Sequence, residues 1–440
     1  MWFRLPLDAG APPLISEAAG IERIVARPAG TYTMLVTVLD SPQARLLRAG
    51  ITVCHRVRDG EGEWYIASKA WPGLPREVSY EVGESGNLPA DLQHKLNLFL
   101  REEAIGPFAT MECDRHEYVL RGEDGDIVEI RDDIITISKD GVERSKAREL
   151  VMTPLVKLTG QQREFIHTAM QAVDASVLER PPSLQERIGP PATGLTSFRP
   201  PSQFDAGMTL EEYVAEVLLT HLHALLLAEL DDDRPATKRV LSSLDADLHG
   251  LSPVIEPAWR ESLEHDVRAL PGAPEDDIEA ILVRIIDALV AGVRAPKLGD
   301  LSNELARSVL FSRAEHALII LLDRCRSLTK EATDEEWSAT LRSAEHFECT
   351  AKVTEPLFPK QMRKLRNHLD ALREGLRASV MPADDVELVG LSAEDAYQLG
   401  RDMEHARWSV ARARRAFVDA WPSRVPKMSK AMKKMRKQAA

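Results

Sequence analysis

The spacing of apolar residues changes once along the chain, and this change most constrains the fold. Up to about residue 172, short β-branched or aromatic runs such as Thr33–Val38 and Ile51–Val57 are separated by turns containing glycine. From Thr209 onward, apolar residues instead recur at intervals of three and four, which is the period of an α-helix. The sequence therefore predicts an α+β protein, with an N-terminal antiparallel β-barrel and a C-terminal all-α helical bundle.

Three Pro-Pro pairs separate the two patterns. They are Pro181-Pro182, Pro190-Pro191 and Pro200-Pro201, among Gly, Ser and Thr residues. So many prolines favour an extended chain with few packing contacts, and we expect a linker here. The expected domains are a barrel over residues 1–172, a Pro-rich linker over 173–208, a helical domain over 209–421 and a basic tail over 422–440.

Charge is distributed unevenly along the chain. The whole protein has a net charge of −13, yet its last 19 residues hold seven basic side chains and no acidic one. The preceding 421 residues therefore carry a net charge of −20. Such a body repels polyanions at long range, although a local basic groove can still attract them.

Cysteine usage and hydropathy favour a cytoplasmic protein. The four cysteines lack CxxC spacing, so we expect reduced thiols and no zinc site. The first residues show no basic stretch followed by an apolar one, and no signal peptide is expected. The most apolar segment, Tyr213–Leu230, includes Glu216, His221 and His223, which favours a buried core helix over a transmembrane segment. The two histidines would point about 200° apart on a helix, too far to share a metal ion.

A long stretch of the N-terminal half follows the pattern of a known family. Leu39–Lys69 reads LDSPQARLLRAGITVCHRVRDGEGEWYIASK. This segment resembles the substrate-binding hairpin of the CYTH, or triphosphate-tunnel, domain. The shared features, in order, are an aspartate turn, a Leu-rich short helix, an arginine strand, a Gly turn and a strand that begins with Trp. The segment Gly106–Glu149 resembles later strands of that domain. The resemblance implies a barrel that binds triphosphate through Lys and Arg and holds a divalent metal through glutamates.

Only part of the cationic charge implied by this resemblance is present. Cys54 stands where the family has an arginine, and the first strand offers at most Arg4 in place of a lysine. Arg-x-Arg on a strand more often belongs to a solvated face, and that alternative stays open. The candidate phosphate contacts are Arg56, Arg58, Lys69 and Arg115.

The carboxylates for a metal are fewer still. The final strand keeps Glu149, but Val151 and Thr153 stand where the family has carboxylates. Glu77 is the second candidate metal ligand. The pair Asp132-Asp133 matches the family, and we expect it at a turn or at the barrel rim.

The C-terminal half resembles a second family. Trp337–Arg377, followed by the Arg-rich segment Glu394–Trp421, is similar to the second half of a CHAD domain, and residues 209–294 to its first half. The resemblance implies a bundle that binds polyphosphate in a basic channel. Five positions that would carry channel cations are neutral or acidic: Ser242, Ser243, Asp245, Glu345 and Glu348. The basic candidates that remain are Lys238, Arg363, Lys364 and Arg366, for which a merely solvated helix face is the alternative.

The basic tail gives a signal that is independent of any family. Its candidate phosphate contacts are Lys430, Lys433, Lys434 and Lys437. Met428, Met432 and Met435 would share one face of a helix. Such a helix suits polyphosphate, nucleic acid or an anionic membrane surface, and the alternative is a disordered, solubilising end.

These patterns favour a non-catalytic CYTH–CHAD protein, a degenerate triphosphatase that binds or scaffolds at polyphosphate or another polyanion. It would require no cofactor, and it would lie in the cytoplasm, in association with polyphosphate granules. The alternatives are a metal-dependent inorganic triphosphatase or polyphosphatase, which would use Mg²⁺ or Mn²⁺, and a nucleic-acid or anionic-surface adaptor acting through the tail. A protein partner is a further expectation, and the sequence sets no oligomeric state.

Overall fold

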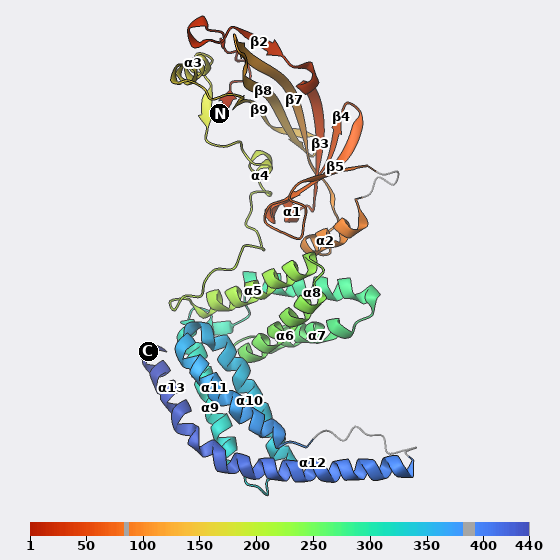
Figure 1. Cartoon of the computed structure of the whole chain (residues 1–440), viewed down its shortest axis with the longest axis vertical. Helices are drawn as coiled ribbons and strands as arrows, with labels where there is room; N and C mark the ends of the chain where they lie inside the picture. The colour runs from red at the N-terminus through yellow and green to blue at the C-terminus, as the bar shows by residue number, and fades with distance from the viewer. Residues whose placement is uncertain (83–87, 382–391, 440) are drawn as a thin grey trace. The chain divides into compact units, whose positions relative to one another are not determined.

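The structure, a computed structural model, describes residues 1–82, 88–381 and 392–439. The chain divides into two compact units, one formed by Met1–Arg199 with Leu226–Asp233 and the other by Pro200–Leu225 with Arg234–Ala440. A large antiparallel sheet dominates the first unit, and the second is helical (Figure 1). The predicted α+β class is confirmed.

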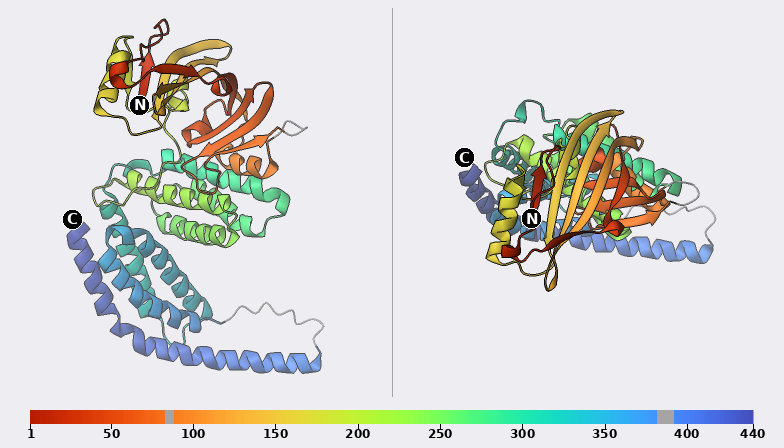
Figure 2. Two further views of the ribbon diagram at one scale, coloured as in Figure 1. Left: turned by 45° about the horizontal axis from the view of Figure 1, so that its top comes forward. Right: turned by 90° about the horizontal axis from the view of Figure 1, so that it is seen from above.

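The first unit is built on one curved, ten-stranded sheet (Figure 2). Its long strands β7, β8 and β9 follow one another in the chain, and the turn Asp140-Gly141 between the last two has φ of 53° and 74°. Aspartate and glycine tolerate this left-handed backbone, as the Asp-Gly pattern predicts. The strand order is β10 (Ser176–Leu178), β1 (Trp2–Leu5), β9 (Val142–Pro154), β8 (Gly125–Lys139), β7 (Gly106–Gly122), β3 (Tyr32–Asp40), β4 (Ile51–Arg58), β5 (Glu61–Ser68) and β6 (Val78–Glu81), with β2 (Arg23–Ala26) on β7. Within the described residues no backbone pairing joins β10 to β6, so the expected barrel is an open, curved sheet.

Each face of this sheet packs against helices. Because side chains alternate along a strand, Leu150 and Glu149 of β9 point to opposite faces. Leu150 lies in a core with Phe3 of β1 and Ile166 of α3 (Gly160–Gln171). The other face packs its apolar part against α1 (Arg45–Arg48) and α4 (Leu184–Ile188). A further helix, α2 (Ala90–Leu100), completes this unit.

Much of the predicted linker belongs to the sheet unit. Strand β10 pairs with β1, and α4 opens with a capping box in which Ser183 and Glu186 satisfy each other's backbone N–H groups. Ile188 and Phe198 are buried, at 7% exposure each. The expectation of an extended, poorly packed segment is therefore wrong for residues 176–198.

The second unit contains helices whose apolar stripes match the predicted periodicity. In α11, the buried residues Met362, Leu365, Leu369, Leu372 and Leu376 recur every three or four positions. Among the described helices, α5 is long and apolar enough to cross a membrane, and 67% of its apolar window is buried inside the protein. The helices are α5 (Leu210–Leu230), α6 (Arg234–Leu251), α7 (Pro257–Ala269), α8 (Glu275–Arg294), α9 (Ala306–Ser327), α10 (Asp334–Thr354), α11 (Pro359–Ala378), α12 (Ala393–Ala420) and α13 (Val425–Ala439).

The expected basic tail is the helix α13, which packs on α9 and α11. Its methionines do share one face, but that face is part of the hydrophobic core: Met428 and Met435 are 0% exposed and Met432 is 4% exposed. This packing contradicts the expectation of a disordered end. It also contradicts the expectation that the methionine face is free to enter a membrane. Its lysines remain exposed on the outer side.

Candidate functional site

A row of charged residues crosses one face of the sheet. Arg4 on β1 lies opposite Glu149 on β9, Glu149 opposite Asp133 on β8, and Asp133 opposite Arg115 on β7. Directly opposed residues on neighbouring strands point to the same side. This row is the part of the structure where the sequence places the triphosphate site.

The charges in this row bind one another. Arg115 donates to both carboxylate oxygens of Asp133, at 2.7 and 2.8 Å. Glu149, only 5% exposed, accepts hydrogen bonds from Arg187 of α4 at 2.7 and 2.6 Å and from Arg4 at 3.4 Å. These bidentate pairs are among the strong hydrogen bonds of proteins. The predicted phosphate contact Arg115 and the predicted metal ligand Glu149 are therefore both engaged within the protein.

The pKa values follow from these contacts. Burial alone would raise the pKa of Glu149, but hydrogen bonds and positive charge from Arg187 and Arg4 outweigh it and lower this pKa. The hydrogen bonds to Asp133 raise the pKa of Arg115. Both groups are consequently held in their charged forms.

A metal ion would have to compete with these arginines. Both oxygens of Glu149 accept from Arg187, and a hard divalent cation needs several free carboxylate oxygens. Glu77 is exposed just before β6 and forms a hydrogen bond with Tyr65. No group of three or more His, Cys, Asp and Glu residues that could hold a metal occurs within the described parts of the chain.

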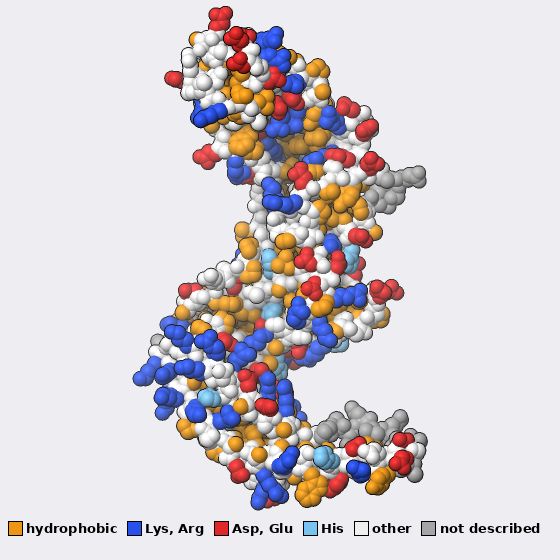
Figure 3. All heavy atoms as spheres, in the orientation of Figure 1, with side chains coloured by type: hydrophobic (Ala, Val, Ile, Leu, Met, Phe, Trp, Pro, Cys, Tyr) orange, Lys and Arg blue, Asp and Glu red, His pale blue; other side chains and the backbone are white. Residues whose placement is uncertain are grey.

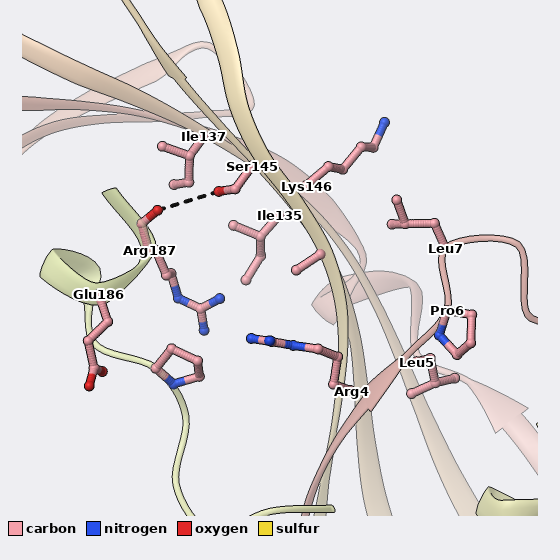
Figure 4. Close-up of a pocket in the computed structure, with 12 residues that line it drawn as sticks. Arg4, Leu5, Pro6, Leu7, Ile135, Ile137, Ser145, Lys146, Glu186 and Arg187 are labelled. Carbon is pink, nitrogen blue, oxygen red and sulfur yellow. Dashed lines mark hydrogen bonds between the residues drawn. The ribbon is translucent and has the colours of Figure 1, made fainter. Parts of the chain in front are cut away.

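The short helix α4 covers this face of the sheet. Ile188 packs into the apolar cluster that contains Cys54 and Cys113, and Gln185 donates to the Leu47 carbonyl at 3.2 Å. The Ser145 hydroxyl donates to the carbonyl of Arg187 (Figure 4). Helix α4 therefore packs on the same face of the sheet as the charged row.

A cavity of about 430 Å³ remains beside α4. Its floor includes Ile135 and Ile137 of β8, and the guanidinium groups of Arg4 and Arg187 face each other across it, while Lys146 points away (Figure 4). Arg4 is the more accessible of the two arginines, with 47% of its side chain exposed against 13% for Arg187.

The arginines of β4 stack on aromatic rings. Arg56 lies over the ring of Tyr65, 3.2 Å from its centroid, and is 3.6 Å from Glu63. Arg58 lies over Tyr32, at 3.8 Å, and Arg115 donates to the hydroxyl of that same tyrosine at 3.0 Å. Two of the predicted cations, Arg58 and Arg115, thus meet at Tyr32. Lys69 is exposed just beyond the end of β5.

Sequence reasoning missed two parts of this arrangement. Arg187 was assigned to the linker, although the Ser183-x-x-Glu186 capping pattern before it was a signal for a helix. Asp132 and Asp133 lie within β8 and not at a turn or rim, and Asp132 binds Arg148 at 2.9 and 2.6 Å. Asp132 and Asp133 thus each form an ion pair with an arginine of a neighbouring strand, Arg148 of β9 and Arg115 of β7.

In the helical unit, predicted cations of two separate segments come together. The side chains of Gln361 on α11 and Gln438 on α13 share a hydrogen bond of 2.8 Å. Further along, burial first, and then the positive charges of Lys427 and Arg424, lower the pKa of His368. These contacts fix α11 and α13 side by side in opposite directions. By helical periodicity, Lys364 lies between Gln361 and His368 on one helix, and Lys434 between Lys427 and Gln438 on the other.

We refer to this surface as the α11–α13 basic face. Lys and Arg side chains gather around the C-terminal end of α13 in Figure 3. None of its lysines forms an ion pair within the described chain, and α13 carries no carboxylate. The face comprises Lys360, Arg363, Lys364, His368, Arg424, Lys427, Lys430, Lys434 and Lys437.

The other candidates of this unit lie elsewhere. Arg366 is on the far side of α11, where it pairs with Glu355 at 2.5 Å. Lys433 is exposed towards the α9 side of α13, next to Arg436, which pairs with Glu315. Lys238 is exposed on α6, a helix that packs on α7 and α10. On the Arg366 side of α11, Glu345 and Glu348, at positions where the resemblance implies cations, form ion pairs with arginines.

Comparisons with known proteins add little to this geometry. No protein-family model and no curated protein matches the chain. Among solved structures, the PH1819 protein from Pyrococcus horikoshii OT3 matches 43% of this chain and 94% of its own length, at 15% identity and a TM-score of 0.23. A similarity this weak carries no argument about function.

Proposed function

We propose that this protein is a non-catalytic polyanion-binding protein of the CYTH–CHAD type, and that it binds polyphosphate on its helical unit. The observation that carries the proposal is the α11–α13 basic face. Its lysines come from two helices, are exposed and have no carboxylate partner among the described residues.

A linear polyanion suits this face better than a compact ligand does. The cations are spread along two antiparallel helices, and adjacent turns of a helix are about 5.4 Å apart. A phosphate chain lying along this face would meet several of them in succession. Each contact would release counterions, so affinity should fall steeply with salt, as it does for the phosphate backbone of nucleic acids.

The sheet unit supports the non-catalytic part of the proposal. Its best candidate metal ligand, Glu149, is bound by two arginines, and α4 packs over the same face. Hydrolysis of a triphosphate would require several carboxylates free to bind a metal.

The buried methionines disfavour membrane insertion as the role of α13. A surface-bound helix inserts its apolar face into the lipid, whereas here that face is in the core. Nucleic acid remains an outcome that the experiment must distinguish.

Matched lysine variants test the proposal. One full-length variant carries Lys430→Gln, Lys434→Gln and Lys437→Gln. Its control carries Lys238→Gln, Lys297→Gln and Lys330→Gln, which remove the same charge at exposed positions of the same unit. Binding of long-chain polyphosphate and of single-stranded RNA is measured from 50 to 300 mM salt, and phosphate release is assayed with Mg²⁺ or Mn²⁺.

We expect the first variant to bind polyphosphate at least about tenfold more weakly and to lower the salt slope by about two, because each contact contributes roughly 0.7. The control should bind as the parent does. Equal binding by both variants would refute the placement of the polyphosphate site on the α11–α13 basic face. Tighter binding of RNA than of polyphosphate would indicate a nucleic-acid-binding protein. Metal-dependent phosphate release by the parent would establish an enzyme.

A further inference from the structure

A second basic cavity lies inside the helical unit, away from the lysines of α13. It has a volume of about 320 Å³ and is formed by α6, α9 and α10. This size is at the lower end of the range for small-molecule sites. Its polar lining consists of His249, Arg324, Arg342, Ser343 and His346, and Ile320 belongs to its apolar wall.

Helix periodicity and one glycine bring these side chains together. Ile320 and Arg324 are one turn apart on α9, and Arg342 and His346 are one turn apart on α10. Gly250 follows His249 on α6, and a Cβ atom added there would lie 2.4 Å from the carbonyl oxygen of Cys349. The close crossing of α6 and α10 therefore depends on glycine, and this crossing places His249 against His346.

The two imidazoles form a hydrogen-bonded pair. His346 Nδ1 lies 3.3 Å from His249 Nε2, and the rings are perpendicular with centroids 5.1 Å apart. Burial, and then the charge of His249, lower the pKa of His346. At neutral pH, His346 is therefore uncharged, and one ring can donate to the other.

The carboxylates near the pair already have partners. On α6, Asp245 pairs with Arg268 at 2.9 Å, and Asp247 with His221 at 2.7 Å and Lys352 at 2.9 Å. On α10, Glu345 pairs with Arg377 at 3.4 Å, and on α9, Asp323 pairs with Arg326 at 2.5 Å. The cavity lining itself contains no carboxylate.

The arginines of the cavity are available to a ligand. Arg324 has no ion pair in the described part of the chain. Arg342 pairs with Glu335 across side chains that are 62% and 77% exposed, and such a surface pair is weak. Two guanidinium groups beside the histidines repel a metal cation but favour an oxyanion. The Ser343 hydroxyl already donates to the Ala339 carbonyl at 3.0 Å, so the arginines and the histidine pair are the groups that would hold the anion.

We infer that this cavity binds a small organic phosphate, whose anionic group lies between the arginines and the histidine pair while its apolar part contacts Ile320. Binding strengthens as the pH falls, because a bound anion favours a protonated imidazole. This site is independent of the proposed polyphosphate surface, since it shares none of its residues.

The test uses a probe whose own charge does not change with pH. Benzenesulfonate is titrated into the full-length protein by calorimetry at pH 7.5 and 5.5, and phenyl phosphate serves as the closer ligand analogue at pH 7.5. The variants are Arg324→Gln and His346→Gln, and Arg415→Gln, at an exposed position of α12 outside the cavity, is the control.

We expect benzenesulfonate to bind about tenfold more tightly at pH 5.5, since a new charge-assisted hydrogen bond is worth about one order of magnitude in affinity. His346→Gln should remove this pH dependence, Arg324→Gln should weaken binding at both pH values, and Arg415→Gln should change neither. In the parent, the probe should also shift the His346 NMR titration to higher pH. Binding that is equal at both pH values, or unaffected by Arg324→Gln, would overturn the inference.

Discussion

The ion pair between Glu149 and Arg187 gives the sharpest test of the sheet unit, because the metal-site and structural roles of Glu149 predict different results. If Glu149 is a structural anchor for α4, Glu149→Gln should destabilise the sheet unit whether or not a metal is present. The neutral amide keeps the shape of the side chain but leaves Arg187, only 13% exposed, without its anion.

The magnitude follows from the contacts. Charge-assisted hydrogen bonds contribute about 1.5–3 kcal/mol, and removing one partner of a buried pair costs about 3–5 kcal/mol. Arg187 retains some access to water, so we expect a loss of about 2–4 kcal/mol in the free energy of unfolding. This loss corresponds to a fall in Tm of roughly 5–15 °C for a unit of this size.

The loss should depend on pH in a defined direction. The folded protein lowers the pKa of Glu149, so its ion pair stabilises the fold above the ordinary glutamate pKa of about 4.3. This contribution disappears as the pH falls through the lower, folded pKa. The difference in stability between the parent and Glu149→Gln should therefore be constant from pH 6 to 8 and shrink towards pH 3.

Urea unfolding followed by circular dichroism measures this difference. Arg180→Gln is the matched control, because Arg180 pairs with Glu186 of α4 in an exposed geometry and such a surface pair contributes little to stability. The double variant Glu149→Gln with Arg187→Gln should lose less than the sum of the single losses. A difference that is absent at pH 7, or unchanged at pH 3, would refute the anchoring role.

Three further predictions concern the core of the helical unit and the metal. Met432→Ser with Met435→Ser should destabilise that unit by at least about 3 kcal/mol, measured by thermal unfolding, because both side chains are buried; an unchanged Tm would mean that α13 is a free tail. Gly250→Ala should cost about 1–3 kcal/mol, since the added Cβ meets the Cys349 carbonyl, and wild-type stability would contradict the close crossing. Millimolar Mg²⁺ or Mn²⁺ should leave the Tm of the sheet unit unchanged, and a rise that Glu149→Gln removes would reveal a metal site.

Local patterns predicted the elements well. The three- and four-residue period that begins at Thr209 predicts helices, and one of them, α8, spans Glu275–Arg294. The strand predicted over Ile51–Val57 is β4, Ile51–Arg58. In both, the apolar residues that set the pattern are also the ones that are buried, so the local signal and the tertiary structure agree.

The sequence was less informative where pairing is between distant segments. Nothing near Glu149 in the sequence indicates that Arg187 binds it, because the contact spans 38 residues and depends on how α4 packs. The lysines of α13 and those of α11 were predicted separately, and only the antiparallel packing of the two helices joins them. The methionine stripe was recognised, but periodicity alone does not say whether an apolar face meets lipid or a protein core.

The position of β1 within the sheet has a consequence for biosynthesis. Trp2 pairs with Val151 on one side and with Leu178 on the other, so the first strand completes its pairing only after residue 178 has been made. At about 5–20 residues per second, roughly 10–35 s pass on the ribosome between the two events. During that interval Phe3 and Leu5, which are buried in the finished protein, have no complete partner surface. The nascent sheet would thus expose an unpaired edge for many seconds, whereas α9, α10 and α11 can pack as soon as each has been made.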